Sequence, residues 1–175
     1  SSEQQNFTTN NSNDVYDVRK KYFGDRKVDS EYHAENIDVL VNNSVLFKYS
    51  YNLLQQFPLN NTKKIFFLNN KFGLSSKELL NNKHFNESWR LVAKTQDYEG
   101  KSFVAAIEHV KFPFYGLQIH PEKIQFDSND HLNQISQNNH LYYIPSNEEA
   151  ILVNSRISLN FVTECKKNKN RFKSY

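Results

Sequence analysis

The sequence predicts one folded unit of the α/β class, and three observations indicate it. Short apolar runs of strand length occur at residues 37–41 and 63–70. Two further runs, 89–96 and 101–110, flank a tight turn, which predicts a β-hairpin. The segment 146–167 has the apolar spacing of a helix that docks on a sheet. A length of 175 residues suits a single domain with its own core.

The N-terminal residues 1–35 mix polar and charged side chains without a sustained period. We expect a polar tail or a cleaved surface loop there, and a folded domain over residues 36–175. Within that domain, "VLFKYSYNLLQQF" at residues 45–57 places its apolar residues at helical spacing and ends at Pro58.

The segment from Trp89 to His120 carries the clearest local pattern. Gly100 in "DYEG" suits a turn position with positive φ, so the flanking runs form a hairpin. "FYGLQI" at residues 114–119 then predicts a third strand. His120 follows it at its C-terminal end, the edge at which open α/β sheets bind ligands.

The capping residues and the distribution of charges both indicate the same start and end for the last predicted helix. Ser146 and Glu149 make a capping box, acidic residues fill the first turn, and lysines fill the last. Lys166 and its neighbours form a basic tail, which accounts for much of the net charge of +3. Because no aromatic residues are interleaved with these cations, a solvated helix end is favoured over a nucleic-acid site.

No nucleophile of a recognised kind is present. The single cysteine, Cys165, falls at the C-terminal end of the predicted helix, where the helix dipole disfavours the thiolate, so we expect it to be non-catalytic. No G-x-S-x-G occurs either. The six histidines show no zinc-ligand spacing and the four glycines form no phosphate-binding loop, so neither a metal nor another cofactor is predicted.

Two features of the whole sequence bear on the cellular location of the protein. No apolar run reaches the length of a membrane span. Five N-x-[ST] sequons, slightly more than chance provides, favour a lysosomal, vacuolar or secreted glycoprotein; they begin at Asn6, Asn10, Asn42, Asn60 and Asn86.

The segment "SFVAAIEHVKFPFYGLQIHPEK" at residues 102–123 closely resembles a segment of the γ-glutamyl hydrolase family. Weaker likeness extends from residue 37 to about residue 173. The resemblance implies the class I glutamine amidotransferase-like fold, a three-layer α/β/α domain, of which this chain would be the C-terminal part. By the same resemblance His120 is the catalytic base and Glu122 its orienting carboxylate.

Two positions depart from the family pattern, and one large part is missing. Ile119 stands where the family has a tryptophan before the histidine, and Asn70 stands where we expect a histidine. The nucleophile-bearing half of the family domain has no counterpart here. Because the chain contains no methionine, we expect that a precursor was cut and that a separate N-terminal chain completes the sheet and carries the cysteine.

Two interpretations therefore stay open. The chain is the histidine-bearing part of a processed cysteine hydrolase acting on poly-γ-glutamyl folates or γ-glutamyl peptides. Alternatively, it is an inactive structural or binding module of the same fold, which Asn70, Ile119 and the absent nucleophile would fit. For the assembled unit a homodimer is a further open expectation.

Overall fold

A computed structural model describes residues 27–57, 63–127 and 143–170 of the chain. Among these residues the strands form two antiparallel sheets, one of two strands and one of four. The smaller sheet pairs β1 (Lys27–Glu35) with β3 (Phe66–Phe72). The larger sheet has the order β2-β4-β5-β6; its strands are β2 (Asp38–Val39), β4 (Trp89–Gln96), β5 (Ser102–His109) and β6 (Tyr115–Leu117).

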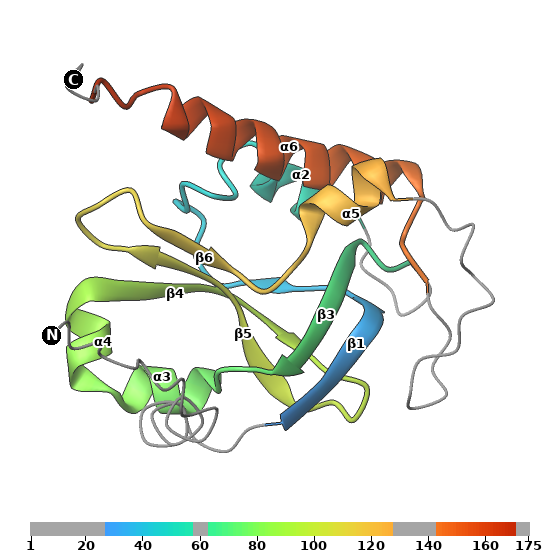
Figure 1. Ribbon diagram of the computed structural model, residues 1–175, viewed down its shortest axis with the longest axis horizontal. Coiled ribbons are helices and arrows are strands. Elements are labelled where there is room, and N and C mark those ends of the chain that lie inside the picture. The colour runs from blue at the N-terminus through green and yellow to red at the C-terminus, as the bar shows by residue number, and fades with distance from the viewer. Residues whose placement is uncertain (1–26, 58–62, 128–142, 171–175) are drawn as a thin grey trace, which may run out of the picture.

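Helices cover both faces of this strand layer, as Figure 1 shows. On one face lie α2 (Tyr51–Gln56), α5 (Pro121–Phe126) and α6 (Glu148–Cys165). On the other lie the short helices α3 (Ser76–Asn81) and α4 (Lys83–Ser88). The predicted α/β class is confirmed, with helix layers on either side of the strands.

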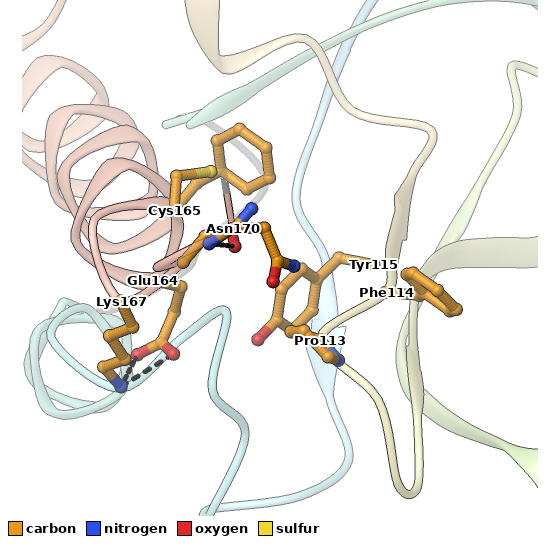
Figure 2. Close-up of a pocket in the computed structure, with 9 residues that line it drawn as sticks. Pro113, Phe114, Tyr115, Glu164, Cys165, Lys167 and Asn170 are labelled. Atoms are coloured by element: carbon orange, nitrogen blue, oxygen red, sulfur yellow. Dashed lines mark hydrogen bonds and ion pairs between the residues drawn. The ribbon is translucent and has the colours of Figure 1, made fainter. Parts of the chain in front are cut away.

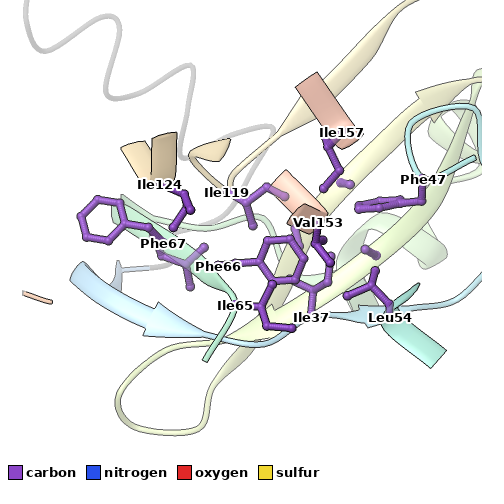
Figure 3. Close-up of a cluster of buried hydrophobic side chains, with 14 of the residues drawn as sticks. Ile37, Phe47, Leu54, Ile65, Phe66, Phe67, Ile119, Ile124, Val153 and Ile157 are labelled. Atoms are coloured by element: carbon purple, nitrogen blue, oxygen red, sulfur yellow. The ribbon is translucent and has the colours of Figure 1, made fainter. Parts of the chain in front are cut away.

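The main hydrophobic core fills the space between the strands and the α2, α5 and α6 layer (Figure 3). Phe47, Phe66 and Phe67 are almost completely buried in it. Val153 and Ile157 of α6 face into the same cluster. A smaller cluster beneath α3 and α4 is built on Leu79, Leu91 and Val104. Burial of this apolar surface provides the driving force that holds the layers together.

The predicted β-hairpin is confirmed, and Asp97 explains how its turn closes. The Asp97 carboxylate accepts the backbone N–H groups of Glu99 at 3.0 Å and Lys101 at 2.8 Å. Gly100 has φ +78°, the left-handed conformation that glycine adopts without a steric penalty. The turn therefore fixes the register of β4 against β5.

The boundary predicted at residue 35 is wrong, because residues 27–35 form β1. The polar residues of this strand find partners inside the fold, so their polarity did not prevent strand formation. Ser30 is fully buried and donates its hydroxyl to the carbonyl of Asn70 at 3.0 Å. Residues 1–26 lie outside the described residues, as do the sequons at Asn6, Asn10 and Asn60.

Several further predicted elements differ in extent from the observed ones: the strand expected at 63–70 is Phe66–Phe72, and the one expected at 114–119 is Tyr115–Leu117. The strand expected at 37–41 is regular only over Asp38–Val39, which pair with Lys94 and Ala93 of β4. The helix expected at 45–57 is regular only over Tyr51–Gln56. The long helix is confirmed, but its N-cap is Asn147 rather than Ser146, because the Asn147 side chain accepts the Ala150 N–H at 2.9 Å.

Candidate active site

His120 lies where the third strand of the hairpin region passes into α5. Ile119 forms an isolated antiparallel bridge with Leu68 of β3, and the His120 N–H donates to the Phe67 carbonyl at 2.9 Å. Pro121 occupies the first turn of α5, where a missing N–H costs nothing, and it disfavours helical geometry at His120. The histidine is thus the N-cap residue, with its backbone held by β3 and its side chain making no cap hydrogen bond.

The imidazole of His120 is paired with the carboxylate of Glu122. His120 Nδ1 lies 2.9 Å from Glu122 Oε1. An ionised carboxylate can only accept, so Nδ1 carries the proton and Nε2 of the neutral ring has a lone pair. The His120 side chain is 34% exposed and that of Glu122 57%, so both are within reach of solvent. The structure therefore brings the two predicted site residues into direct contact.

Two residues of β3 support this pair from beneath. The buried Phe67 ring meets the imidazole edge-on, with ring centroids 6.3 Å apart. The Asn70 side chain donates to the Gln118 carbonyl at 2.9 Å, two residues before the histidine. Asn70, singled out as a departure from the family pattern, therefore ties β3 to the segment that leads into the site.

The other departure, Ile119, lies in the core. It is 3% exposed and belongs to the main hydrophobic cluster. A change of residue at this position alters the packing between β3 and the α5–α6 layer.

A buried polar network that the sequence analysis did not identify stabilises β1. Lys64 Nζ lies 2.5 Å from Glu35 Oε1, and His33 Nε2 lies 3.5 Å from Glu35 Oε2. Burial alone would raise the pKa of Glu35, but its contacts with His33, Lys64 and the Asn36 N–H outweigh burial and lower the pKa to about 2. In the sequence, only the spacing of His33 and Glu35, two residues apart and so on the same face of a strand, indicates this network.

Tyr98, in the hairpin turn, packs against this network. Its ring lies 3.9 Å from that of His33, and its hydroxyl donates to the Tyr32 carbonyl at 3.1 Å. Burial, assisted by the negative charge of Asp29, raises the pKa of Tyr98 to about 12. The phenol therefore stays protonated and keeps its hydrogen bond throughout the physiological range.

A second buried carboxylate, Glu108, connects β5 to the segment before α2. It is 3% exposed and accepts from the Ser44 hydroxyl at 2.6 Å and the Leu46 N–H at 2.7 Å. Arg90 donates to its other oxygen at 2.7 Å. Because every described contact of this carboxylate is internal, its role is to hold the scaffold together.

Cys165 is exposed at the end of α6 and lies in a different place from the histidine. It lines an open pocket of about 520 Å³ together with Tyr115, Phe161 and Glu164, and His120 is not among the lining residues (Figure 2). Burial raises the pKa of Tyr115, as do the charges of Glu164, Glu108 and Cys165. The structure does not bring this thiol together with the predicted base.

The described parts of the chain contain neither a metal-ligand cluster nor a helix that could span a membrane. Over residues 27–57, 63–127 and 143–170, no group of three or more His, Cys, Asp or Glu side chains could hold a metal ion. Over the same residues, no helix has the length and apolar character needed to cross a membrane. His131 and His140, two of the six histidines without zinc-ligand spacing, lie outside the described residues.

Comparison with known proteins identifies three curated relatives and no matching family model. The chain is 28% identical over 124 residues to γ-glutamyl hydrolase 2 of Arabidopsis thaliana, covering 68% of the chain and 33% of the relative. It is 27% identical to probable γ-glutamyl hydrolase 3 of the same plant, covering 68% of the chain and 32% of the relative. It is 26% identical over 153 residues to γ-glutamyl hydrolase B of Dictyostelium discoideum, covering 73% and 43%.

These matches confirm the resemblance that the segment at residues 102–123 indicates. The chain nevertheless spans only about a third of the length of the two plant relatives.

Proposed function

We propose that this chain provides the general base of a cysteine-type γ-glutamyl hydrolase, with the nucleophilic cysteine carried by another polypeptide segment. The observation that carries the proposal is the pair of His120 and Glu122, with Nδ1 and Oε1 2.9 Å apart. The pairing fixes one tautomer and leaves Nε2 to accept a proton. The names of the three similar proteins supply the reaction class.

In the proposed reaction, His120 Nε2 takes the proton of the cysteine thiol. The thiolate attacks the carbonyl carbon of a γ-glutamyl amide, and the imidazolium then protonates the departing amine. Water, deprotonated by the same imidazole, hydrolyses the thioester and regenerates the thiol. Glu122 keeps the ring oriented and stabilises the imidazolium, the role of the third member of a triad. The substrates are poly-γ-glutamyl folates or γ-glutamyl peptides.

The unpaired edge of strand β6 supports the proposal that a partner segment lies beside the histidine. β6 is the terminal strand of the four-stranded sheet and pairs with β5 on one side. Among the described residues no strand pairs with the other edge of Tyr115–Leu117. A strand added there would complete the sheet as the class I glutamine amidotransferase-like fold requires. Its end could then present a cysteine next to His120, three residues further along the chain.

The test uses the native protein that contains this chain, purified with every co-purifying segment. Intact mass and N-terminal sequencing identify whether a cysteine-bearing chain accompanies it. We expect hydrolysis of a γ-glutamyl peptide, and a fall in turnover on the order of a thousandfold or more in His120→Ala. Wild-type turnover in a folded His120→Ala variant would refute the assignment.

A second candidate, an inactive module of the same fold, is favoured by Asn70. Its amide is engaged with the Gln118 carbonyl at 2.9 Å, where the resemblance leads us to expect an imidazole. If the module interpretation is correct, the wild-type native protein shows no γ-glutamyl hydrolysis. It would also carry no thiol that iodoacetamide alkylates faster than free cysteine.

A further inference from the structure

The turn between β5 and β6, residues 110–114, carries three large apolar side chains that are at least half exposed. Val110, Phe112 and Phe114 are 50%, 57% and 57% exposed. Surface turns ordinarily consist of small, polar or proline residues, so two exposed phenyl rings in one turn need a separate explanation. Figure 1 shows this aromatic turn projecting beyond the sheet on the side of the molecule where α6 ends. His120 follows the opposite end of β6, so the turn is separate from the candidate active site.

His109 and backbone hydrogen bonds give the aromatic turn a fixed shape. His109 Nδ1 accepts from the backbone N–H groups of Lys111 at 3.0 Å and Phe112 at 3.1 Å. The Phe114 N–H donates to the Phe112 carbonyl at 2.8 Å, and the His109 N–H donates to the Phe114 carbonyl at 2.9 Å. The centroids of the two phenyl rings lie 5.9 Å apart, and they lie 5.0 and 5.9 Å from that of His109. The rings are therefore presented together without further ordering of the turn, which lowers the entropic cost of binding.

Lysine side chains border the aromatic turn. Lys111 lies within the turn, and Lys166, Lys167 and Lys169 come directly after the last residue of α6. All four are exposed. The turn and the end of α6 are neighbours in space, because Phe114 and Lys167 line the same pocket (Figure 2).

Most of this positive charge is not neutralised within the fold. Lys167 Nζ lies 2.5 Å from Glu164 Oε1, so the charges of that pair cancel. Over the parts of the chain that the structure describes, no ion pair involves Lys111, Lys166 or Lys169. The surface around the turn therefore combines exposed aromatic rings with uncompensated cations.

We propose that the aromatic turn and the lysines beside it are a docking surface for a membrane with anionic lipid headgroups. Phe112 and Phe114 enter the boundary between headgroups and acyl chains, where aromatic side chains are favourable. The lysine stems lie along apolar surface while their ammonium groups contact the anionic headgroups. The positive charge selects an anionic surface. A lipid bilayer deforms around a projecting turn, whereas a protein partner would need a matching cavity. The proposal does not depend on the proposed hydrolase chemistry.

The small number of contacts sets the expected strength of docking. One lysine near an anionic surface strengthens binding about fivefold, and burial of a half-exposed phenyl ring strengthens it about tenfold. The test mixes the native protein that contains this chain with phosphatidylcholine vesicles holding about 30% phosphatidylserine. Co-sedimentation is measured at about 0.05 and 0.5 M sodium chloride. Binding should weaken at the higher salt, and it should be at least about tenfold weaker to vesicles of phosphatidylcholine alone.

Substitutions separate the aromatic and the basic contributions. Phe112→Ala should weaken vesicle binding about tenfold, and Lys111→Glu should weaken it about twentyfold at the lower salt. The matched controls are Phe72→Ala, at a 50% exposed ring at the end of β3, and Lys77→Glu, at an exposed lysine of α3. Both controls should bind within about twofold of the wild type, although Lys77→Glu changes the net charge as much as Lys111→Glu does. Melting temperatures exclude unfolding of each variant.

Other outcomes overturn the proposal. If the native protein does not sediment with the anionic vesicles at about 0.05 M salt, the turn is not a membrane-docking surface. If Lys77→Glu weakens binding as much as Lys111→Glu, the attraction comes from net charge and not from the turn. If Phe112→Ala leaves vesicle binding unchanged, the rings do not enter the bilayer. If Phe112→Ala instead releases a co-purifying segment, another polypeptide covers the turn.

Discussion

The backbone N–H of His120 donates to the carbonyl of Phe67 at 2.9 Å, and the Phe67 ring meets the imidazole edge-on at 6.3 Å between centroids. Phe67 is 1% exposed, so the candidate base is attached to a closely packed part of the core. Its position is therefore determined by the packing of β3.

Replacing Phe67 with leucine should affect stability and turnover together. The smaller side chain leaves a partial cavity beneath the imidazole, so we expect a loss of about 1–2 kcal/mol in the free energy of unfolding. Turnover should fall several-fold because the ring loses its support. Phe66→Leu is the matched control: Phe66 is equally buried, but no contact of its ring with His120 is found among the described residues. Equal turnover losses in both variants would contradict the positioning role.

The buried Glu35 predicts a specific dependence of stability on pH. Its pKa is about 2 in the folded protein, against 4.5 ordinarily, so the folded state favours the ionised form. Stabilisation is therefore complete above about pH 4.5 and is lost as the pH falls towards 2; its full size is on the order of 3 kcal/mol. Glu35→Gln should destabilise the protein at pH 7, and the difference from the wild type should shrink below pH 4.

Urea unfolding of the native protein at pH 7, 4 and 2.5 measures this difference. Glu149→Gln serves as the control, because Glu149 is paired with the largely exposed Lys63 and should change stability little. If the free energy of unfolding differed between Glu35→Gln and the wild type by the same amount at all three pH values, the contacts of Glu35 would not lower its pKa.

The α/β class and the hairpin could be predicted from the sequence because each depends on local patterns, whereas His120 and Glu122 were singled out by the resemblance of residues 102–123 to a known family. Gly100 sets the turn, and Pro121 begins α5 directly after the histidine. β1 could not be predicted in this way. Its polar residues are satisfied only by partners far away in the chain, such as Ser30 by the Asn70 carbonyl. Single-sequence periodicity contains no information about such long-range contacts.

The glycine before α3 predicts a steric effect. A Cβ on Gly73 would lie 2.8 Å from the Phe103 ring and 2.8 Å from Val28, both buried. Gly73→Ala should therefore cost about 1–3 kcal/mol through overpacking between β5 and β1. At Gly100 a Cβ would meet nothing within 4 Å, so Gly100→Ala tests the strain of positive φ alone, at about 1 kcal/mol. Thermal unfolding of both variants measures the difference, and a Gly100→Ala cost above that of Gly73→Ala would contradict it.

Substitutions of Glu122 and His120 should separate the roles of the two site residues. Glu122→Gln keeps an amide oxygen that can accept from His120 Nδ1, so the tautomer is retained while the charge that stabilises the imidazolium is lost. Since the Glu122 side chain is 57% exposed, solvent screens this charge, and we expect kcat to fall only about tenfold. Glu122→Ala removes the acceptor as well and should cost more. His120→Ala should cost a thousandfold or more, because no proton acceptor remains.

The KM for a γ-glutamyl peptide should stay within about twofold in all three variants, because neither group is needed to bind the ground state. Steady-state kinetics on the native assembly gives the two constants separately, and melting temperatures exclude unfolding. If the two residues had only a structural role, the variants would have lower melting temperatures and less active enzyme. The kcat values would then not fall in the order Glu122→Gln, Glu122→Ala, His120→Ala. If Glu122→Gln and His120→Ala were equally inactive, the carboxylate would itself take part in proton transfer. If KM rose and kcat stayed constant, the pair would bind substrate instead of activating a thiol.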